Sequence, residues 1–280
     1  MPVYKASALR GGMGSMLMDS YCREDGKCDD CRLERECPVR NIMYSHMKIQ
    51  PSFMSSGNSV GYVIECEDYH DYFRAGETMN FNVILFGGTT EYTGIIPEAL
   101  KKLGAAGLGR EKARFDVFSK EDTDPEKLHI RTVADYVAYR KEKLAGATDL
   151  VLNFKTPLSL KYQNEILKDF SIEALNQSLC RRIYMLDCFE GIESGIHEKK
   201  YVYSIPLPGV LSEDRRTVTV KRYSDRRKCS MDLYGIQGKM RLYGVSRELM
   251  DILIAGELIH AGKNTSFGFG RYHIEIEDVT

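Results

Sequence analysis

The sequence predicts an α+β protein built from two tandem ferredoxin-like (RRM-like) domains. In the second half, hydrophobic periodicity predicts the order strand, helix, strand, strand, helix, strand, which is typical of one ferredoxin-like unit. The first half predicts the same order without its first strand, and both halves end with a helix, a glycine-rich turn and a strand. We therefore expect an N-terminal domain over residues 1–121, a linker over 122–148 and a C-terminal domain over 149–280.

The N-terminal half contains segments typical of five elements. A helix is predicted at 7–18, strands at 60–67 and 78–86, a helix at 95–103 and a strand at 114–118. The strand segments are rich in β-branched and aromatic residues, which favour a pleated, half-buried surface. Between the first helix and the first strand, a cysteine-rich insertion at 22–37 interrupts the pattern.

The C-terminal half supplies the complete set of six elements. Strands are predicted at 149–154, 217–223, 234–245 and 272–276, and helices at 172–189 and 246–260. Ser246 is suited to cap the last helix, and Glu248 in its first turn complements the helix dipole. Between the halves, the polar connection could hold a strand at 128–132 and a helix at 133–144.

Composition limits the class of protein. The 280 residues are 43% hydrophobic, and 17 Tyr and 11 Phe supply aromatic mass for a core although Trp is absent. No segment approaches the roughly 20 apolar residues that a membrane helix needs, and the N-terminus lacks the apolar core of a signal peptide. We expect a soluble, cytoplasmic protein without a membrane partner, whose eight cysteines are reduced thiols or metal ligands.

Charge is unevenly distributed along the chain. The net charge of −1 argues against indiscriminate nucleic-acid binding. Residues 215–228 are nevertheless strongly basic and are opposed only by Asp225; the basic residues are Arg215, Arg216, Lys221, Arg222, Arg226, Arg227 and Lys228. The stretch fits a groove for an RNA backbone or, equally, a strand edge that its charges protect from aggregation.

A glycine-rich segment lies between the last predicted helix and strand. It contains Gly262, Gly268 and Gly270, with Lys263 and Arg271 alongside. Glycines let a backbone approach a bulky ligand, and N–H groups left free there can hold phosphate oxygens. Dinucleotide-binding fingerprints and P-loops follow a strand and open a helix, which is the opposite order. The segment therefore predicts a loop that holds a polyanion through its backbone. The order of its elements argues against a nucleotide cofactor site.

Four cysteines occur within one short polar segment. They are Cys22, Cys28, Cys31 and Cys37, with a Cys-x-x-Cys pair at the centre. Four thiols in this arrangement suit a tetrahedral structural zinc ion, which would order a segment of low apolar content. The outer spacings are not those of a common zinc finger, so an iron–sulfur cluster and four free thiols remain the alternatives.

Four segments together resemble the CRISPR-associated repeat-processing endoribonucleases, the Cas6 type of the RAMP superfamily. In chain order they are residues 4–12, the cysteine segment at 22–37 with Pro38, the Leu-Gly to Arg-Phe stretch at 103–115, and the glycine-rich motif at 258–272. The family usually has a strand before residues 5–11, whereas only four residues precede them here. We therefore expect the first domain to lack its N-terminal strand.

The resemblance implies an endoribonuclease that cuts precursor CRISPR RNA within its repeats without a metal or other catalytic cofactor. The ribose 2′-OH would attack the neighbouring phosphate, giving a 2′,3′-cyclic phosphate and a 5′-OH. The implied partners are CRISPR repeat RNA and, for some relatives, subunits of a CRISPR effector complex. An alternative is a RAMP subunit that binds CRISPR RNA without cutting it, and a more distant one is a zinc-stabilised protein-interaction module.

Histidine is the natural acid–base group for such chemistry near neutral pH. His260 precedes the glycine-rich segment and is one catalytic candidate, although it could equally cap the helix and complement its dipole. His46 is the second candidate, because Tyr44, His46 and Lys48 would supply an acid, a base and a cation as the family's active sites do. Its alternative is an ordinary loop histidine.

Further residues are predicted to bind RNA. They are Arg10, Gly262, Lys263, Asn264, Thr265, Ser266, Gly268, Gly270 and Arg271. Arg10 is expected at the start of the first helix, where the dipole attracts phosphate. A base could stack on Phe267 or Phe269, and at least one of these two rings is expected in the core.

Overall fold

The computed structural model describes residues 1–24, 26, 31, 36–53, 60–109, 111–119, 130–224 and 229–276. The chain divides into two compact units. The first comprises Met1–Ser119, Met185–Glu193 and Lys221–Met231, and the second comprises Lys120–Tyr184, Ser194–Val220 and Asp232–Thr280. Both units are thus discontinuous in sequence, whereas the sequence suggested two continuous domains joined by a linker.

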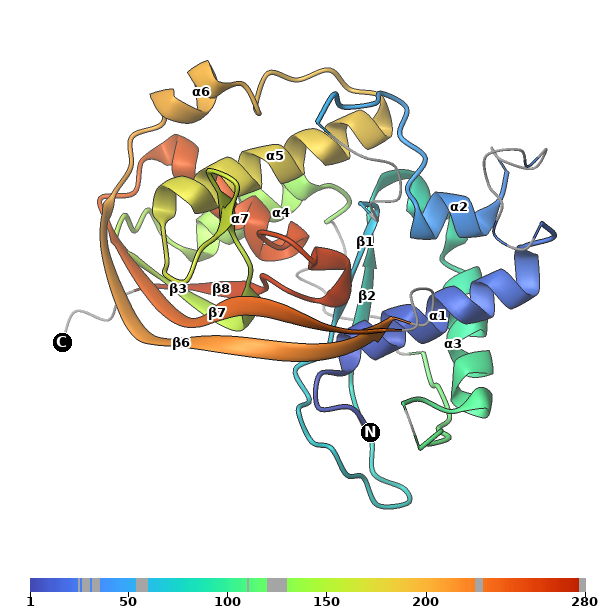
Figure 1. Cartoon of the computed structure of the whole chain (residues 1–280). Coiled ribbons are helices and arrows are strands. Elements are labelled where there is room, and N and C mark those ends of the chain that lie inside the picture. The colour runs from blue at the N-terminus through green and yellow to red at the C-terminus, as the bar shows by residue number, and fades with distance from the viewer. Residues whose placement is uncertain are drawn as a thin grey trace. The chain divides into compact units, whose positions relative to one another are not determined.

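The second unit is built on an antiparallel sheet with two long helices. The strands are β3 (Leu150–Leu158), β6 (Gly209–Ser224), β7 (Cys229–Tyr243) and β8 (Tyr272–Ile276), and the helices are α5 (Ile172–Glu190) and α7 (Arg247–Ile259). The strands lie in the order β6-β7-β3-β8 (Figure 1). In this βαββαβ unit the first strand pairs with the third and the fourth, which is the ferredoxin-like topology that the sequence predicted.

The core of this unit lies between the sheet and the helices. Leu152 of β3 is opposite Met240 of β7 and Ile274 of β8, and these three side chains are buried with Leu179 of α5 and Leu253 of α7. One face of the sheet is therefore covered by α5 and α7. The predicted cap of the last helix is confirmed, because the Ser246 hydroxyl accepts the N–H of Leu249 at 3.3 Å.

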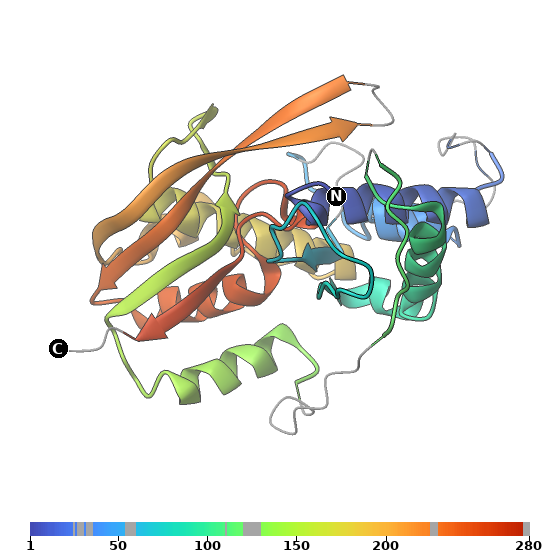
Figure 2. The ribbon, with the colours of Figure 1, turned by 90° about the horizontal axis from the view of Figure 1, so that it is seen from below.

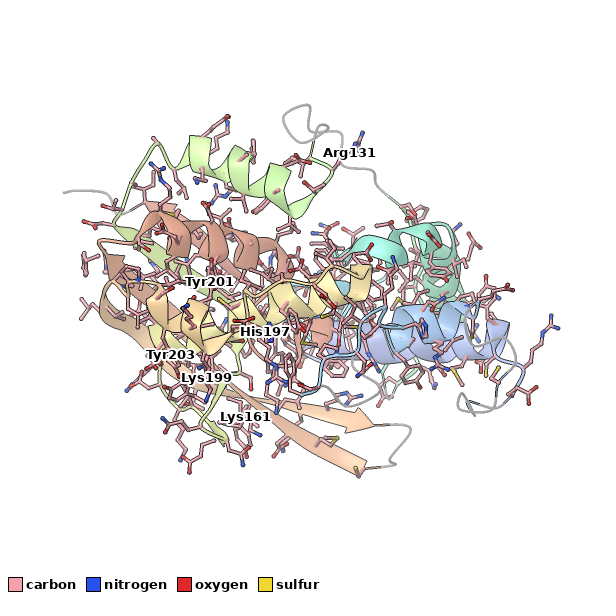
Figure 3. The ribbon with its side chains drawn as sticks, turned by 90° about the horizontal axis from the view of Figure 1, so that it is seen from above. Arg131, Lys161, His197, Lys199, Tyr201 and Tyr203 are labelled. Carbon is pink, nitrogen blue, oxygen red and sulfur yellow. The ribbon has the colours of Figure 1, made fainter. Side chains whose placement is uncertain are left out.

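Shorter elements complete the second unit. They are α4 (Val133–Lys143), the paired strands β4 (Lys161–Tyr162) and β5 (Glu165–Ile166), α6 (Lys199–Ser204) and the 3-10 helix η2 (Thr265–Phe267). Helix α4 lies beside α7 (Figure 2), so part of the stretch expected to be a linker is packed structure. Figure 3 labels Lys199, Tyr201 and Tyr203 on α6.

The first unit contains a two-stranded sheet and three α-helices among its described residues. Its elements are α1 (Lys5–Tyr21), α2 (Pro38–Met43), β1 (Tyr62–Glu65), β2 (Asn82–Leu85), the 3-10 helix η1 (Gly87–Tyr92) and α3 (Ile95–Ala106). Strands β1 and β2 are antiparallel, with Val63 opposite Ile84. In the described residues no strand precedes α1, as the sequence predicted.

The predicted strand at 114–118 is wrong, because that segment follows α3 closely instead of pairing with a sheet. The N–H of Phe115 donates to the carbonyl of Gly104 in α3 at 3.1 Å. A Cβ atom at Gly104 would lie 2.1 Å from the Phe115 carbonyl oxygen, so only glycine permits the approach. A predicted strand at 128–132 is also not formed over its described residues 130–132.

The glycines of α1 lie inside the helix and serve close packing. A Cβ atom at Gly12 would lie 2.4 Å from Leu103 of α3, and one at Gly14 would lie 2.5 Å from Met43 of α2. Both helices can therefore approach α1 closely. Helix α1 also carries the buried Lys5, whose ammonium group donates to the Asp68 carbonyl at 2.8 Å and lies 3.2 Å from the Asp68 carboxylate.

A buried carboxylate ties α4, α7 and β8 together. Glu257 of α7, with a 2% exposed side chain, accepts from Arg140 Nε and Nη2 at 2.8 and 3.0 Å and from Tyr136 at 3.1 Å, both on α4. It also accepts the N–H of Ile274 on β8 at 3.0 Å. Burial raises the pKa of Glu257, but hydrogen bonds from His273 and Arg140 lower it by more than burial raises it. The net shift of the pKa is therefore downward.

We expect Glu257→Gln to lower the free energy of unfolding by about 3–5 kcal/mol at pH 7, because it leaves the partly buried Arg140 guanidinium, whose side chain is 20% exposed, without its counter-charge. The folded pKa of Glu257 lies below the ordinary value of about 4.3, so the unfolded chain takes up the proton first. The stabilisation is thus present above pH about 4.3 and is lost as the pH falls through the folded pKa. Urea unfolding at several pH values measures both effects.

Asp251→Asn is the matched control, since Asp251 lies on the same helix and pairs with Lys141 at 2.7 Å, but at the surface. That change should cost less than about 1 kcal/mol. The assignment would be contradicted if the two variants lost the same free energy of unfolding. It would also be contradicted if the stability of Glu257→Gln fell at acid pH as steeply as that of the wild type.

Candidate functional site

The glycine-rich loop between α7 and β8 is folded back on its own backbone. Gly262, Gly268 and Gly270 have positive φ angles of 80°, 83° and 73°. A Cβ atom at Gly270 would lie 1.8 Å from the carbonyl oxygen of Ala261, and one at Gly262 would lie 2.5 Å from that of Ser159. The space that these two glycines provide is therefore filled by the protein itself, and not left for a ligand as the sequence suggested.

Many backbone N–H groups of the loop are also used within the fold. Ala261 donates to Gly270 at 3.0 Å, Gly270 to Pro157 at 2.9 Å and Lys263 to Ser159 at 2.8 Å. In the described part of the chain, the N–H groups of three consecutive residues make no such bond: Asn264, Thr265 and Ser266. The donors that remain for an anion are thus confined to the apex of the loop.

The apex carries one exposed cation. Lys263 is exposed, and Gly262, Asn264 and Arg271 are half-buried. The other predicted contacts are buried: Thr265, Ser266, Gly268 and Gly270. Phe269 is fully buried, which confirms that at least one of the two phenylalanines packs in the core.

Helix α5 holds the start of the loop through two polar residues that sequence reasoning missed. The Ser178 hydroxyl accepts the N–H of Gly262 at 3.0 Å, and Arg182 Nε donates to the carbonyl of Ile259 at 3.3 Å. Arg182 is 5% exposed, and burial lowers its pKa to about 10. The only signal in the sequence is that these two polar residues lie one helical turn apart on an otherwise apolar face.

His260 closes the loop from inside. Its side chain is 0% exposed, and its Nδ1 atom lies 3.1 Å from the carbonyl oxygen of Phe269. Its φ angle of 62° reverses the chain directly after α7. An imidazole in this position presents no surface to RNA, so the geometry favours a structural role and disfavours the predicted catalytic one.

Arg10 does not lie at a helix N-terminus. It is half-buried in the interior of α1, which begins at Lys5. Backbone N–H groups are free only in the first turn of a helix, so the predicted dipole contact with phosphate does not apply at this position.

The segment after α2 presents a histidine on a firmly held backbone in the first unit. Ser45 is 3% exposed, and its hydroxyl accepts the N–H groups of Val60 at 2.7 Å and Gly61 at 3.2 Å. The neighbouring His46 is exposed, and Tyr44 is half-buried at the end of α2. Ser45 thus anchors the chain at the point where His46 faces solvent, and sequence reasoning did not identify it.

Lys48 adds a cation two residues further on. It is exposed, its ammonium group lies 3.8 Å from the Glu190 carboxylate, and it donates to the Glu190 carbonyl at 3.4 Å. The same carboxylate accepts the N–H of Gly88 at 2.8 Å, and Ile49 donates to Cys188 at 3.0 Å. The segment that carries the predicted catalytic group is therefore attached on both sides of His46.

The proposed metal site is described only in part. Cys22, Cys31 and Cys37 are half-buried free thiols, and Cys28 lies outside the described residues. The Cys22 sulfur accepts the N–H of Gly26 at 3.2 Å, a contact that also suits a metal-bound thiolate. Within the described ranges, no group of three or more His, Cys, Asp or Glu side chains is suited to a metal ion.

The described part of the basic stretch lies on β6. Arg215, Arg216 and Lys221 are exposed on β6. Arg215 forms an ion pair with Asp169, and Arg216 donates to the Gln237 side chain at 3.2 Å. Arg222 is half-buried, and Arg226, Arg227 and Lys228 lie outside the described residues. Both interpretations of this stretch stay open.

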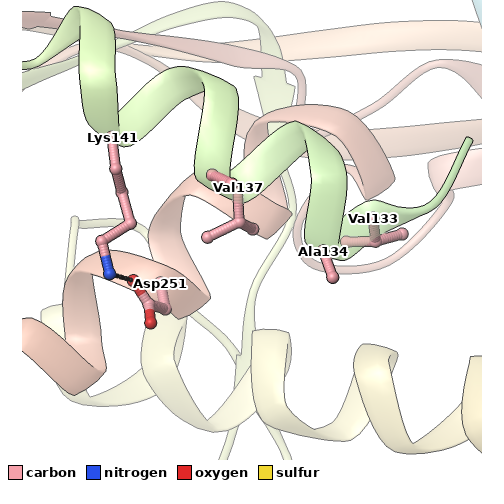
Figure 4. A pocket seen from close by; sticks show the side chains of 6 residues that line it. Val133, Ala134, Val137, Lys141 and Asp251 are labelled. Carbon is pink, nitrogen blue, oxygen red and sulfur yellow. Dashed lines mark ion pairs between the residues drawn. The ribbon is translucent and has the colours of Figure 1, made fainter. Parts of the chain in front are cut away.

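A shallow groove of about 630 Å³ lies between α4 and α7 (Figure 4). Its lining is mainly apolar and consists of Val133, Ala134, Val137, Ala138, Lys141 and Asp251. Its two charged side chains pair with one another, so the groove offers no acid–base group for catalysis.

Among the described residues, no helix is long and apolar enough to cross a membrane.

Comparisons with known proteins agree with this architecture. Residues 1–143 match the AF_1859_N family, described as an N-terminal domain, and residues 152–272 match the CRISPR-associated endoribonuclease Cas6 family. No curated protein matches the sequence. The two family matches lie side by side along the chain, and the second includes the glycine-rich loop.

Solved structures show the same fold. The product complex of the Cas6 protein TTHB231 has a TM-score of 0.55 at 13% identity and covers 98% of this chain and 95% of its own. The Thermus thermophilus Cas6 (TTHB231) structure gives 0.51 at 12%, covering 98% and 93%. The product complex of Cas6 (TTHA0078) gives 0.51 at 14%, covering 96% and 92%. The chain thus has the fold of these Cas6 structures, and its residues 152–272 belong to the Cas6 family of CRISPR-associated endoribonucleases.

Proposed function

We propose that this protein is a metal-independent endoribonuclease that cuts precursor CRISPR RNA within its repeats. The observation that carries this proposal is the match of residues 152–272, including the glycine-rich loop, to the Cas6 endoribonuclease model. The product complexes of the similar Cas6 structures support RNA as the substrate class. The expected products are a 2′,3′-cyclic phosphate and a 5′-OH.

His46 is the proposed acid–base group. Attack of the ribose 2′-OH on the adjacent phosphate needs removal of its proton, protonation of the leaving 5′ oxygen and stabilisation of the charge that develops on the phosphorane. An exposed imidazole on an anchored backbone can exchange a proton with RNA, and Lys48 can stabilise the phosphorane. Tyr44 can donate a hydrogen bond to the same phosphate.

The glycine-rich loop is proposed to hold the RNA backbone. Lys263 is exposed at its apex beside the half-buried Asn264 amide. The closed backbone beneath them holds the main chain of Lys263 through the bond from its N–H to the Ser159 carbonyl, so only the lysine side chain has to become ordered when it meets a phosphate.

A RAMP subunit that binds CRISPR RNA without cutting it is the second candidate function. It is favoured by the burial of His260, which removes one of the two predicted catalytic histidines from contact with RNA. Such a subunit would hold the RNA inside a CRISPR effector complex. Tight binding of repeat RNA without cleavage would distinguish it from the nuclease.

We expect His46→Ala to slow cleavage of the organism's own repeat RNA by about 10²–10⁴-fold, because general acid–base help is lost. Binding of the RNA should stay within about 2-fold, since the imidazole mainly serves the chemical step. Single-turnover cleavage in EDTA, with end-group analysis of the products, measures the effect and tests metal independence. His70→Ala is the matched control, because His70 is an exposed loop histidine in the same unit.

Wild-type cleavage rates in His46→Ala would refute the assignment of His46. Loss of all cleavage when EDTA is added to the wild-type protein would refute metal independence.

Lys263→Ala should weaken repeat-RNA binding and reduce the slope of log K against log salt by about 1, because one phosphate contact is lost. Lys141→Ala, which removes a half-buried lysine already paired with Asp251, should leave the slope unchanged. Fluorescence anisotropy at salt concentrations from about 50 to about 300 mM measures both slopes. An identical slope in wild type and Lys263→Ala would exclude the phosphate contact.

We further propose that the four cysteines at 22–37 bind a structural metal, with zinc as the expected ion. Purified protein should then contain about one zinc per chain, and Cys31→Ser should lose it. Cys229→Ser is the control, because Cys229 is an exposed thiol on β7. Elemental analysis decides: iron instead of zinc would indicate an iron–sulfur cluster, and neither metal would leave free thiols.

A further inference from the structure

Strand β8 lies at one edge of the sheet in the second unit. The described strands follow the order β6-β7-β3-β8, so β8 pairs with β3 on one side and forms the edge of the sheet on the other. Unpaired N–H and C=O groups along such an edge are a template for a strand from another chain, and proteins usually protect them. The protection of this edge therefore decides whether another strand can join the sheet.

The backbone groups of Ile274, the middle residue of β8, are bonded to side chains. Its N–H donates to Glu257 Oε1 on α7 at 3.0 Å, and its carbonyl accepts from Arg140 Nη2 on α4 at 2.9 Å. In an antiparallel pair, successive residues alternate between bonding to the partner strand and facing away from it. Both groups of Ile274 thus face away from β3, and two side chains occupy the edge of the sheet at this point.

Glu257 and Arg140 together imitate a neighbouring strand. A strand would offer Ile274 one acceptor and one donor, and the carboxylate and the guanidinium offer the same two groups. The two side chains also bond one another, with Oε2 at 2.8 Å from Nε and Oε1 at 3.0 Å from Nη2. They are 2% and 20% exposed, so an incoming strand would have to separate an ion pair that is shielded from water. Such a separation is strongly unfavourable, because it leaves a buried charge without its partner.

Polar contacts contribute much of what holds helix α4 over this edge. None of its residues, all of which are described, is buried, and a shallow groove lies between it and α7 (Figure 4). Besides the Arg140 contact, Tyr136 donates to Glu257 at 3.1 Å, and Lys141 pairs with Asp251 at 2.7 Å. Since α4 has no fully buried apolar side chain, its position at the edge of β8 depends on the contacts with Glu257.

The sequence of β8 is suited to pairing with itself. In an antiparallel pair of two copies centred on Ile274, Tyr272 of one copy would lie opposite Ile276 of the other, so the apolar residues would share one face. On the other face His273 would lie opposite Glu275, a hydrogen-bonding pair that becomes an ion pair when the histidine is protonated. A two-fold axis, the commonest symmetry of protein dimers, would relate the copies. The strand that fits the uncovered edge is therefore β8 of a second copy of this chain.

We propose that the Arg140–Glu257 pair closes the edge of β8 and prevents it from pairing with β8 of a second copy. The pair thus controls association of the protein in addition to stabilising it. The inference does not rest on the proposed function, because it concerns the edge of the sheet and not the RNA.

The experiment removes the pair without leaving a buried charge. Arg140→Met/Glu257→Met replaces both members by apolar side chains, an exchange that often leaves stability unchanged or improves it. Wild-type protein and this double variant are compared by sedimentation velocity at equal concentrations, with circular dichroism as a check of folding. The species formed by the double variant should have about twice the mass of the wild-type species. A folded double variant with the wild-type mass would overturn the proposal.

Three further variants locate the association. In the double variant, Ile276→Pro removes an N–H that alternation places on the free edge, and it should restore the wild-type mass. His273→Glu, also added to the double variant, puts carboxylates opposite one another in the paired strands and should restore it as well. Lys141→Met/Asp251→Met is the matched control, because it removes the surface pair between the same two helices and should leave the wild-type mass unchanged. Association that persists in both restoring variants would exclude β8 as the interface.

A measurement on the wild-type protein tests the inference even if the double variant does not fold. The N–H of Ile274 donates to a buried carboxylate, whereas that of Ile276 belongs to a 44% exposed residue at the end of β8. Hydrogen exchange followed by NMR should therefore be at least about 10-fold slower at Ile274 than at Ile276. Equal exchange rates would show that the side chains do not shield the edge, and the proposal would be wrong.

Discussion

The place of β8 in the sheet depends on a backbone contact that leaves no room for a side chain. Ala261 and Gly270 meet so closely that a Cβ atom at Gly270 would lie 1.8 Å from the Ala261 carbonyl oxygen. Gly270 also donates to Pro157 at the end of β3, so the loop is fastened to the strand that β8 then joins, with Tyr272 opposite Phe154. The same backbone contacts that join β8 to the sheet therefore also set the position of Lys263, and the close approach requires glycine whether or not RNA is bound.

The polar groups around this loop divide into two classes by exposure. His260 and Arg182 are buried and bonded to backbone carbonyls, so their hydrogen bonds offset the cost of burying an imidazole and a guanidinium. Groups that have already met their partners inside the protein contribute to RNA recognition only by holding other groups in place. In the proposed function, contact with RNA is therefore assigned to exposed side chains, of which Lys263 in the second unit and His46 in the first are the clearest.

Sequence patterns predicted elements well wherever a local signal decides the structure. The range 272–276 of β8 and the Ser246 cap are local in this sense. The predicted strand at 114–118 failed, because an extended pattern does not reveal its pairing partner, and here the partner is the backbone of Gly104 in a helix. His260 illustrates a related point: its position beside a glycine-rich loop is visible in the sequence, but its burial is visible only in the folded structure. The Arg140–Glu257 pair was invisible, since its members are separated by 117 positions.

Ser45 shows why a serine and not a glycine precedes the proposed catalytic histidine. Its φ angle of 45° lies in the left-handed region, which costs a residue with a Cβ atom about 1–2 kcal/mol. Glycine would avoid that cost but would lose the hydroxyl that accepts two buried N–H groups, each worth about 0.5–1.5 kcal/mol and more when left unsatisfied. The two terms are of similar size, so stability alone gives serine little advantage. What serine adds is a fixed backbone beneath His46, and in-line attack on a phosphate depends on that fixed geometry because small displacements of a catalytic group slow the reaction steeply.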